Sequence, residues 1–216
     1  SRIPVPVRRS VAEHVHDTFE NCEGGYVRDW NIYSTKWSPV TLEKLNGEAC
    51  LKLADKDPCD YARAMRIFPR SAGVSVLLEI MAGCYDTDLE IELANSAGIP
   101  VCRVLLGGGW LKARYGSNTE KCCKVGPEPV WHTLEIRVHC ANNVYTVLWD
   151  GKEARQYGFG RLVNKANDVE RLILRTKPRR YLPNFEIYPE TPDMPGVDEP
   201  EEERVYFVRN VRTRVL

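Results

Sequence analysis

An acidic segment, TDLEIEL at residues 87–93, is the first candidate for chemistry in this sequence. Asp88, Glu90 and Glu92 occupy alternate positions, so a β-strand would carry Glu90 and Glu92 on one face, about 7 Å apart. Two carboxyl groups at such a distance are able to serve as an acid and as a nucleophile or base. The same alternation also suits any half-exposed strand. Glu90 and Glu92 are therefore catalytic candidates, with a structural role as the alternative.

The histidines and cysteines do not form a metal-binding pattern. His14 and His16 make an H-x-H pair, for which the exposed side of a strand is the better interpretation, and His132 and His139 are scattered. None of the eight cysteines belongs to a C-x-x-C pair. They are either small buried residues or the partners in one to three disulfides of an exported protein. The glycines at 107–109 lack the flanking strand and helix of a phosphate loop and predict a turn.

The elements that must position these residues are strands, and the clearest is a hairpin over residues 131–151 (WHTLEIRVHCANNVYTVLWDG). Leu134, Ile136 and Val138 alternate with polar residues, which is the period of a strand with one buried face. The Ala-Asn-Asn break at 141–143 and the Asp-Gly pair at 150–151 are turn signals. This segment predicts antiparallel β structure.

Strand patterns recur along the rest of the chain. They are separated by turn residues, and an aromatic-rich segment lies at 30–37. We expect a polar connection at 115–121, and no convincing amphipathic helix is present. About a dozen short strands of this kind indicate an all-β sandwich. The predicted strands outside the hairpin lie at residues 11–20, 39–45, 49–53, 63–68, 74–81, 89–93, 100–106, 110–114, 170–176 and 205–212.

The two ends of the chain differ from its middle. Residues 1–10 (SRIPVPVRRS) predict a linker or edge segment, and residues 11–216 predict a single sandwich domain. Six of the 14 prolines lie in residues 177–200. We interpret 177–203 as a proline-rich surface excursion, because residues 205–212 resume the alternation of a strand that returns to the sheet.

Composition excludes some classes of function. Thirty Lys and Arg residues offset 30 Asp and Glu residues, which argues against a general binder of nucleic acid or anionic membranes. No window approaches the roughly 18 consecutive apolar residues of a membrane span. The chain begins at Ser1 without a Met or a signal-like segment, so we expect a mature product or a piece of a longer protein.

Several motifs together resemble a known fold family. They are the opening TFEN at 18–21, the hairpin pattern W-x-x-L-E-I-x-V…Y-x-V-x-x-D-G, and the closing V-x-F-V-x-N-V at 205–211. They resemble the concanavalin A-like lectin/glucanase jelly roll in its laminin G-like form, an antiparallel two-sheet β-sandwich. More narrowly, DKDPCDYARAMRIFP, DLEIEL and VERLILRT are similar to accessory domains of bacterial carbohydrate-active proteins. Some of these follow a sialidase-type β-propeller, and SRIPVPV would then be the junction.

The resemblance implies sugar recognition by a non-catalytic module that binds carbohydrate or supports a neighbouring catalytic domain. The alternatives are a glycan-cleaving enzyme, either a glycoside hydrolase or a polysaccharide lyase, and a laminin G-like protein-interaction module. An extracellular or periplasmic location is implied as well. No cofactor is expected except a structural calcium ion near the terminal strands, for which Asp17, Glu20 and Asn210 are the candidate ligands.

Sugar rings stack on exposed aromatic rings, so the resemblance also implies candidate binding residues. Tyr33 lies among the loop aromatics, whereas packing is the better interpretation for Trp30 and Trp37. Tyr61 and three arginines could serve a lyase, with ion pairs to Glu79, Glu90 or Glu135 as the alternative. The predicted sugar-binding residues are Tyr85, Asp86, Asp88, Trp110, Tyr115, Arg63, Arg66 and Arg175.

Overall fold

The computed structural model describes residues 14–20, 22, 25–82, 88–155, 158–177 and 199–216. Regular secondary structure in these residues consists of strands alone, and none of them forms a helix suited to crossing a membrane. The strands are β1 (His16–Asp17), β2 (Trp30–Tyr33), β3 (Val40–Leu45), β4 (Glu48–Asp55), β5 (Arg63–Ser71), β6 (Gly73–Ala82), β7 (Leu89–Ala94), β8 (Pro100–Gly107), β9 (Trp110–Tyr115), β10 (Asn118–Lys124), β11 (His132–His139), β12 (Val144–Trp149), β13 (Lys152–Glu153), β14 (Phe159–Arg161), β15 (Val169–Thr176) and β16 (Arg204–Val215).

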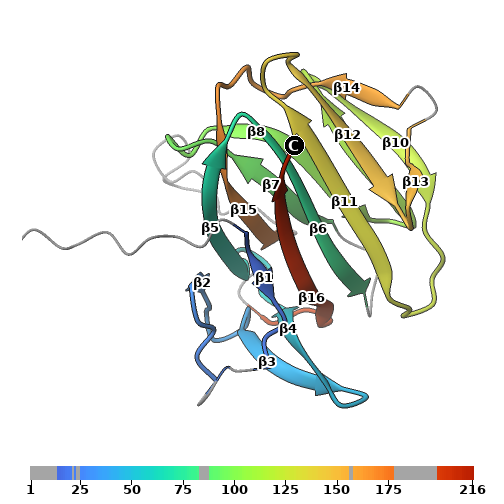
Figure 1. Cartoon of the computed structure of the whole chain (residues 1–216). Helices are drawn as coiled ribbons and strands as arrows, with labels where there is room; N and C mark the ends of the chain where they lie inside the picture. Colours follow the sequence, from blue (N-terminus) through green and yellow to red (C-terminus); the bar gives the residue numbers. More distant parts are fainter. Residues whose placement is uncertain (1–13, 21, 23–24, 83–87, 156–157, 178–198) are drawn as a thin grey trace, which may run out of the picture.

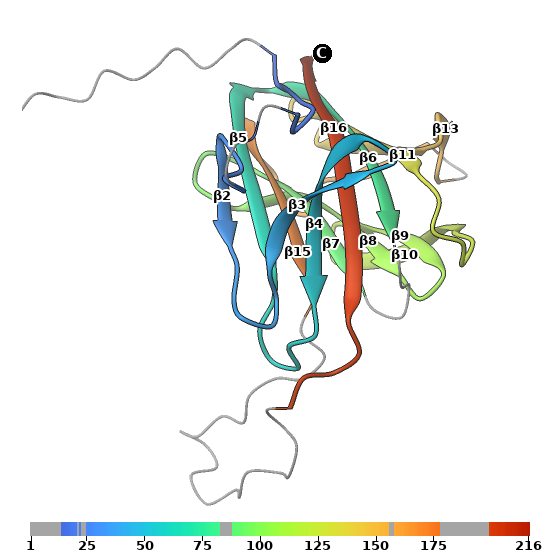
Figure 2. The same cartoon turned by 90° about the horizontal axis from the view of Figure 1, so that it is seen from below.

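The strands form two antiparallel sheets, as predicted for an all-β sandwich. The nine-stranded sheet has the order β13-β12-β11-β6-β16-β4-β3, with β1 paired to β16 and β14 paired to β12. The seven-stranded sheet has the order β10-β9-β8-β7-β15-β5-β2. Figure 1 shows β12, β11, β6 and β16 crossing in front of β8, β7 and β15, and Figure 2 shows β3, β4, β16 and β6 in sequence across one layer.

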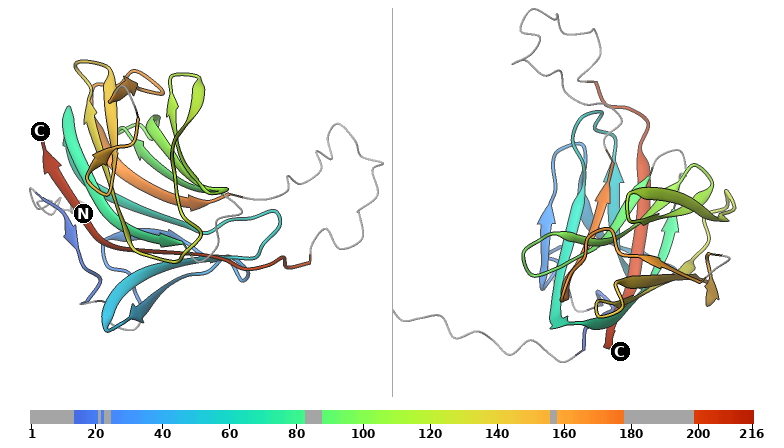
Figure 3. Two further views of the ribbon diagram at one scale, coloured as in Figure 1. Left: turned by 90° about the vertical axis from the view of Figure 1, so that its right-hand side faces the viewer. Right: turned by 90° about the horizontal axis from the view of Figure 1, so that it is seen from above.

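The hydrophobic core lies between the two sheets, which the side view in Figure 3 shows stacked against each other. Alternate residues of β6 and β11 point into it from the nine-stranded sheet, and Leu78, Ile80 and Ile136 are fully buried. Leu89, Ile91 and Leu93 of β7 face them from the seven-stranded sheet. The period-2 alternation of these strands follows from the need to bury one face of each sheet.

The predicted hairpin at 131–151 is confirmed as β11 and β12. Ile136 pairs with Val147 and Val138 with Tyr145. Asn143 and Asp150 adopt positive φ angles of 55° and 49° in the two turns, a backbone conformation that Asn and Asp tolerate better than most residues. This hairpin belongs to the nine-stranded sheet and buries its apolar side in the core.

Other predicted segments differ from the structure. The expected strand at 11–20 is reduced, within the described residues, to the two-residue β1. The polar connection expected at 115–121 is instead largely strand, because Asn118–Lys124 returns as β10 beside β9 after a tight turn at Gly116, φ 60°. Exposure explains the error, since β10 is an edge strand whose side chains are mostly polar and whose pattern lacks a continuous apolar row.

The seven described cysteines are free thiols. Cys50, Cys102 and Cys140 are buried among apolar residues, and burial raises the pKa of the Cys50 thiol to about 11. This agrees with the interpretation of the cysteines as small core residues. Cys84, the linker at 1–10 and residues 178–198 of the excursion at 177–203 lie outside the described residues.

Candidate functional site

The outer face of the seven-stranded sheet gathers most of the described residues that the sequence singled out. Paired residues of antiparallel strands point to the same face, so the register can be followed across the sheet. Tyr33 pairs with Arg63, Arg63 with Arg175, and Arg175 with Glu90. These four residues therefore share the face opposite the core, across β2, β5, β15 and β7.

Tyr33, Tyr61, Arg63, Arg175 and Glu90 form a cluster on this face, which we call the tyrosine–arginine patch. The rings of Tyr33 and Tyr61 lie 5.3 Å apart between centroids, and the guanidinium carbon of Arg175 lies 5.7 Å from the centroid of Tyr61. Tyr33 is 44% exposed. The patch thus offers open aromatic surface beside guanidinium groups.

A hydrogen bond fixes the orientation of the Tyr33 side chain. The hydroxyl of Tyr33 donates to Asp60 Oδ2 at 3.1 Å, and this hydrogen bond raises the pKa of Tyr33. Asp60 and Asp57 lie in the loop between β4 and β5, where their carboxylates accept hydrogen bonds from local backbone N–H groups. This loop therefore holds the rim of the patch in place.

A chain of ion pairs crosses the middle of the same face. Arg175 donates from Nε and Nη2 to Glu90 Oε2, with the Nε distance at 3.0 Å. The other oxygen of Glu90 lies 3.5 Å from Arg103 Nε, and Arg103 donates from Nε to Glu92 Oε2 at 2.8 Å. Burial lowers the pKa of Arg175, but the hydrogen bond and charge of Glu90 outweigh it, so the pKa is raised.

This network changes the interpretation of the DLEIEL segment. The sequence suggested a half-exposed strand, yet all six residues of β7 are buried, with Glu90 9% and Glu92 7% exposed. Strand β7 is central in the sheet, and long arginine side chains from β8 and β15 cover its outer face. Glu90 and Glu92 do share one face, as expected, but their oxygens are occupied by guanidinium groups.

The opposite end of the face carries a second cluster, centred on Trp110 of β9. The ammonium groups of Lys121 and Lys124 on β10 lie 4.9 and 5.7 Å from the centroid of the Trp110 ring. Lys112 forms an ion pair with Asp88 through Nζ and Oδ1 at 2.5 Å. Trp110 and Asp88, both predicted sugar-binding residues, therefore lie on the outer face, although lysines cover part of the indole.

Two of the predicted sugar-binding residues point elsewhere, which corrects the prediction for them. Tyr115 is 7% exposed and packs in the core against Tyr145, with ring centroids 4.9 Å apart. Arg66 pairs with Leu172 on the inner side of its sheet and donates to Asp17 at 2.8 Å. Tyr115 follows Trp110 by an odd number of positions and so faces the opposite way. Tyr85 and Asp86 lie outside the described residues.

The three calcium candidates are each engaged by protein groups. Asp17 Oδ2 accepts from both Arg66 and the indole N–H of Trp30. Glu20 accepts from the Ala49 backbone N–H, and Asn210 donates to Glu79. Within the described residues no group of three or more His, Cys, Asp or Glu side chains is arranged to hold a metal ion. Calcium binding stays a prediction from the resemblance.

The arrangement on the outer face suits non-covalent recognition of a polar ligand with apolar patches. Arg63 makes no ion pair within the described residues and contacts Met65 Sδ at 3.4 Å. Apart from that weak hydrogen bond to sulfur, its N–H donors have no partner within the described residues, and its strand position is next to that of Tyr33. Sequence reasoning found Arg63 and Arg175 but did not connect them to Tyr33, because that connection depends on the pairing of β2 with β5.

Comparison with known proteins adds a family assignment. A family model described as "Sialidase-like, CBM domain" matches residues 30–192. Among solved structures, a sialidase shares 30% sequence identity with a TM-score of 0.81, and the match covers 99% of this chain and 19% of that protein. The chain therefore spans about a fifth of the length of that sialidase. None of the curated proteins compared matches the chain.

Two further solved structures share the fold at low identity. Apo Crh5 transglycosylase is 13% identical with a TM-score of 0.62, and the match covers 95% of this chain and 85% of that one. Alginate lyase Aly36B is 7% identical with a TM-score of 0.57, covering 96% and 98%. At this level of identity the likeness concerns the β-sandwich alone.

Proposed function

Because the chain belongs to the family of sialidase-like CBM domains, CBM meaning carbohydrate-binding module, we propose that it binds saccharide without cleaving it, on the outer face of the seven-stranded sheet. The observation that carries this proposal is the tyrosine–arginine patch, where the exposed Tyr33 ring packs against the Tyr61 ring and lies next in register to Arg63, which has no acidic partner within the described residues. Such a surface offers both kinds of contact that a sugar ring requires.

The two kinds of contact are complementary. A pyranose presents apolar C–H groups on its faces and hydroxyl groups around its edge, so an aromatic ring can cover a face while guanidinium and carboxylate groups bind the edge. Tyr33 and Tyr61 supply the apolar surface in the patch. Arg63 supplies N–H donors, and the Asp60 carboxylate at the rim supplies an acceptor. Rigid aromatic residues lose little conformational entropy on binding.

The ion-pair network favours binding over catalysis. A glycoside hydrolase needs one carboxyl group free to donate a proton and another free to act on the sugar or on water. Glu90 bonds to Arg175 and lies within 3.5 Å of Arg103, and Glu92 bonds to Arg103. Both acids serve in this proposal to hold the arginines in place. A lyase acting through Tyr61 and Arg63 is the competing hypothesis.

The module is proposed to work beside a catalytic domain. The 30% identical relative is a sialidase, and this chain corresponds to about a fifth of its length. A binding module that is tethered to an enzyme holds the enzyme close to its substrate, so the effective concentration of substrate at the catalytic site rises even when the module binds weakly. A glycan-processing partner of this kind acts on extracellular or periplasmic material, and we propose that location for the chain.

A glycan array tests binding, and the panel should contain sialosides because of the sialidase relative. Captured saccharides are then incubated with the wild-type chain and with Glu90→Gln and Glu92→Gln variants, and the products are analysed by chromatography. We expect capture without cleavage by all three proteins. Cleavage by the wild-type chain that both variants abolish would replace the binding proposal with the hydrolase, and cleavage that persists in both would indicate the lyase.

A further inference from the structure

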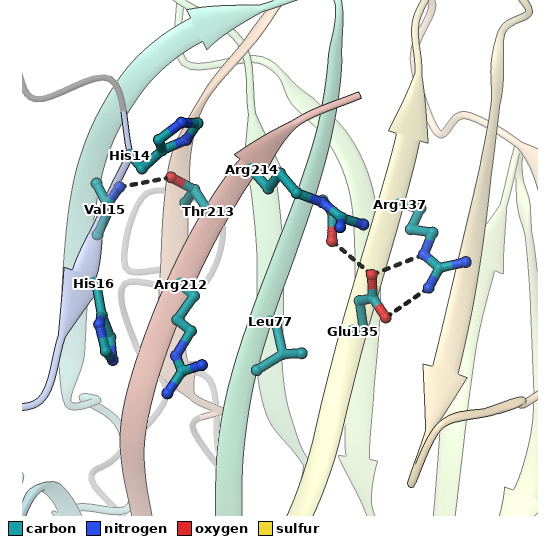
Figure 4. Close-up of a pocket in the computed structure, with 10 residues that line it drawn as sticks. His14, Val15, His16, Leu77, Glu135, Arg137, Arg212, Thr213 and Arg214 are labelled. Atoms are coloured by element: carbon teal, nitrogen blue, oxygen red, sulfur yellow. Dashed lines mark hydrogen bonds and ion pairs between the residues drawn. The ribbon is translucent and has the colours of Figure 1, made fainter.

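A separate groove of about 600 Å³ lies on the opposite side of the molecule, on the outer face of the nine-stranded sheet. Figure 4 shows β1 and β11 on its two sides, with β16 and β6 between them. The side chains that matter for its chemistry are Arg212 and Arg214 of β16, Leu77 of β6, Glu135 and Arg137 of β11, and His16 of β1. Its volume is within the range of small-ligand pockets.

A β-bulge places both β16 arginines in this groove. Tyr206 and Val208 point into the core, so continued alternation would also bury positions 210, 212 and 214. The pairing of β16 with β6 shifts between Arg209 and Arg212, and Asn210 adopts a positive φ of 51°. After this extra residue Val211 and Thr213 point inward instead. Arg212 and Arg214 therefore face outward, about 7 Å apart along the strand.

Strand β1 closes one side of the groove through contacts with β16. The backbone N–H of Val15 donates to Thr213 Oγ1 at 3.1 Å, and the Thr213 N–H donates to the Val15 carbonyl at 3.0 Å. His16 pairs in register with Arg212. As a result, Figure 4 shows the Arg212 guanidinium between the His16 ring and Leu77.

Among the described residues that line the groove, Glu135 is the one acid, and it already has its own partners. Glu135 accepts two hydrogen bonds from Arg137, at 2.7 and 2.9 Å, and a third from the Ser75 hydroxyl at 2.6 Å. The Arg137 hydrogen bonds lower the pKa of Glu135 against the opposing effect of burial, and the charge of Arg214 adds to this lowering. Arg212 and Arg214 form no ion pair or side-chain hydrogen bond within the described residues.

We propose that this groove is a second binding site, which takes the carboxylate of an acidic saccharide. The described residues of its lining carry a formal charge of +2, from three arginines and one glutamate, before any protonation of the histidines. A guanidinium group matches the planar geometry of a carboxylate and binds it through two parallel hydrogen bonds. Leu77 provides an apolar floor for the C–H face of the sugar ring. The inference rests on the proposed carbohydrate-binding function, but not on the tyrosine–arginine patch.

The test is a calorimetric titration of the whole chain with two acidic saccharides, trigalacturonate and α2,3-sialyllactose. Each has a neutral counterpart, the trigalacturonate methyl ester and lactose. We expect at least one acid to bind ten times more tightly than its counterpart. Arg212→Gln and Arg214→Gln should each weaken that binding about tenfold. Arg161→Gln serves as the matched control, because Arg161 is an exposed arginine of the same sheet outside the groove.

The outcomes separate this inference from the function proposed above. Loss of acid binding in Arg212→Gln and Arg214→Gln but not in Arg63→Gln supports the groove, whether or not the patch binds sugar. Loss in Arg63→Gln alone overturns the groove and leaves the patch. The groove is also overturned if neither acid binds, if the neutral counterparts bind equally well, or if inorganic sulfate competes as effectively as the saccharide, which indicates a general anion site.

Discussion

Arg175 on β15 donates both Nε and Nη2 to a single oxygen of Glu90 on the neighbouring strand β7, while its guanidinium carbon lies 5.7 Å from the Tyr61 ring centroid. One arginine thereby links the buried acid of the central strand to the aromatic surface at the edge of the sheet. The carboxylate that sequence alone offered as a catalyst is, in this arrangement, an ion-pair support for the proposed binding surface.

Tyr33→Ala should lower saccharide affinity about tenfold, equivalent to about 1.4 kcal/mol. The side chain is 44% exposed and provides the open aromatic surface of the patch, so its removal should leave the fold intact. Titration calorimetry with a saccharide captured on the array measures the change. Tyr26→Ala is the matched control, because Tyr26 is a 71% exposed tyrosine outside the patch and its loss should not affect binding.

Arg204→Met should destabilise the sandwich by about 3–5 kcal/mol, since it leaves the buried carboxylate of Asp55 without its cation. Arg204 and Asp55 are both fully buried, with Arg204 Nη2 and Asp55 Oδ2 2.9 Å apart. Arg204 also donates to the backbone carbonyl of Asp57 at 3.1 Å, which fixes the start of β16 beside β4. Urea denaturation followed by tryptophan fluorescence measures the loss. Arg212→Met, at an exposed position, should change stability by less than about 0.5 kcal/mol, and an equal loss in both variants would contradict the role of the buried pair.

Glu135→Gln should lower the melting temperature at pH 7 and have less effect at pH 3. The hydrogen bonds from Arg137 hold the pKa of Glu135 below its usual value of 4.5 in the folded state. A carboxyl group with a depressed folded pKa stabilises the protein above its unfolded pKa, and this contribution disappears as the pH falls through the folded pKa. Differential scanning fluorimetry of the two proteins from pH 7 to pH 3 measures the difference. If the difference in melting temperature between the wild-type chain and Glu135→Gln stayed constant or widened on acidification, the ionised Glu135 would not be the stabilising group.

Asn210→Val should destabilise the chain by about 1–2 kcal/mol, because a β-branched residue is strained at a φ of 51°. The substitution also removes the hydrogen bond from Asn210 Nδ2 to Glu79. Asn210→Gly is the control, since glycine adopts positive φ freely and should keep the bulge. Chemical denaturation measures the free energy of unfolding of the two variants, and we expect the Gly variant to be the more stable. Equal stabilities would show that the bulge does not depend on the conformation of residue 210.

The sequence predicted the sandwich because most strands bury one face and so show period-2 alternation, most clearly in β11 and β12. The prediction was wrong for strands whose residue pattern is not set by one buried and one solvated face. β10 is a polar edge strand, and β7 is covered on its outer face by arginines from neighbouring strands rather than by water. A half-exposed strand and an ion-paired central strand have the same alternation of acidic and apolar residues.

The candidate sites were harder to predict, because they depend on pairing between distant segments. Arg63 and Arg175 were named from the sequence, but the strand order β7-β15-β5-β2 is what aligns them with Tyr33 on one face. Arg212 and Arg214 were missed because the single extra residue at Asn210, invisible in a short alternating pattern, decides which way they point. His16 was correctly interpreted as lying on the exposed side of a strand, yet its neighbour Arg212 comes from the far end of the chain.

The most direct test of the central claim is a glycan array probed with the wild-type chain, with Arg63→Gln and with the control Arg161→Gln. Arg63 has donors beside the tyrosine rings and no acidic partner within the described residues, so the substitution removes a ligand contact and no ion pair. We predict that the wild-type chain and Arg161→Gln capture the same saccharides, and that Arg63→Gln binds the neutral members of that set at least ten times more weakly. Unchanged capture by Arg63→Gln, or no capture by the wild-type chain, would contradict the account.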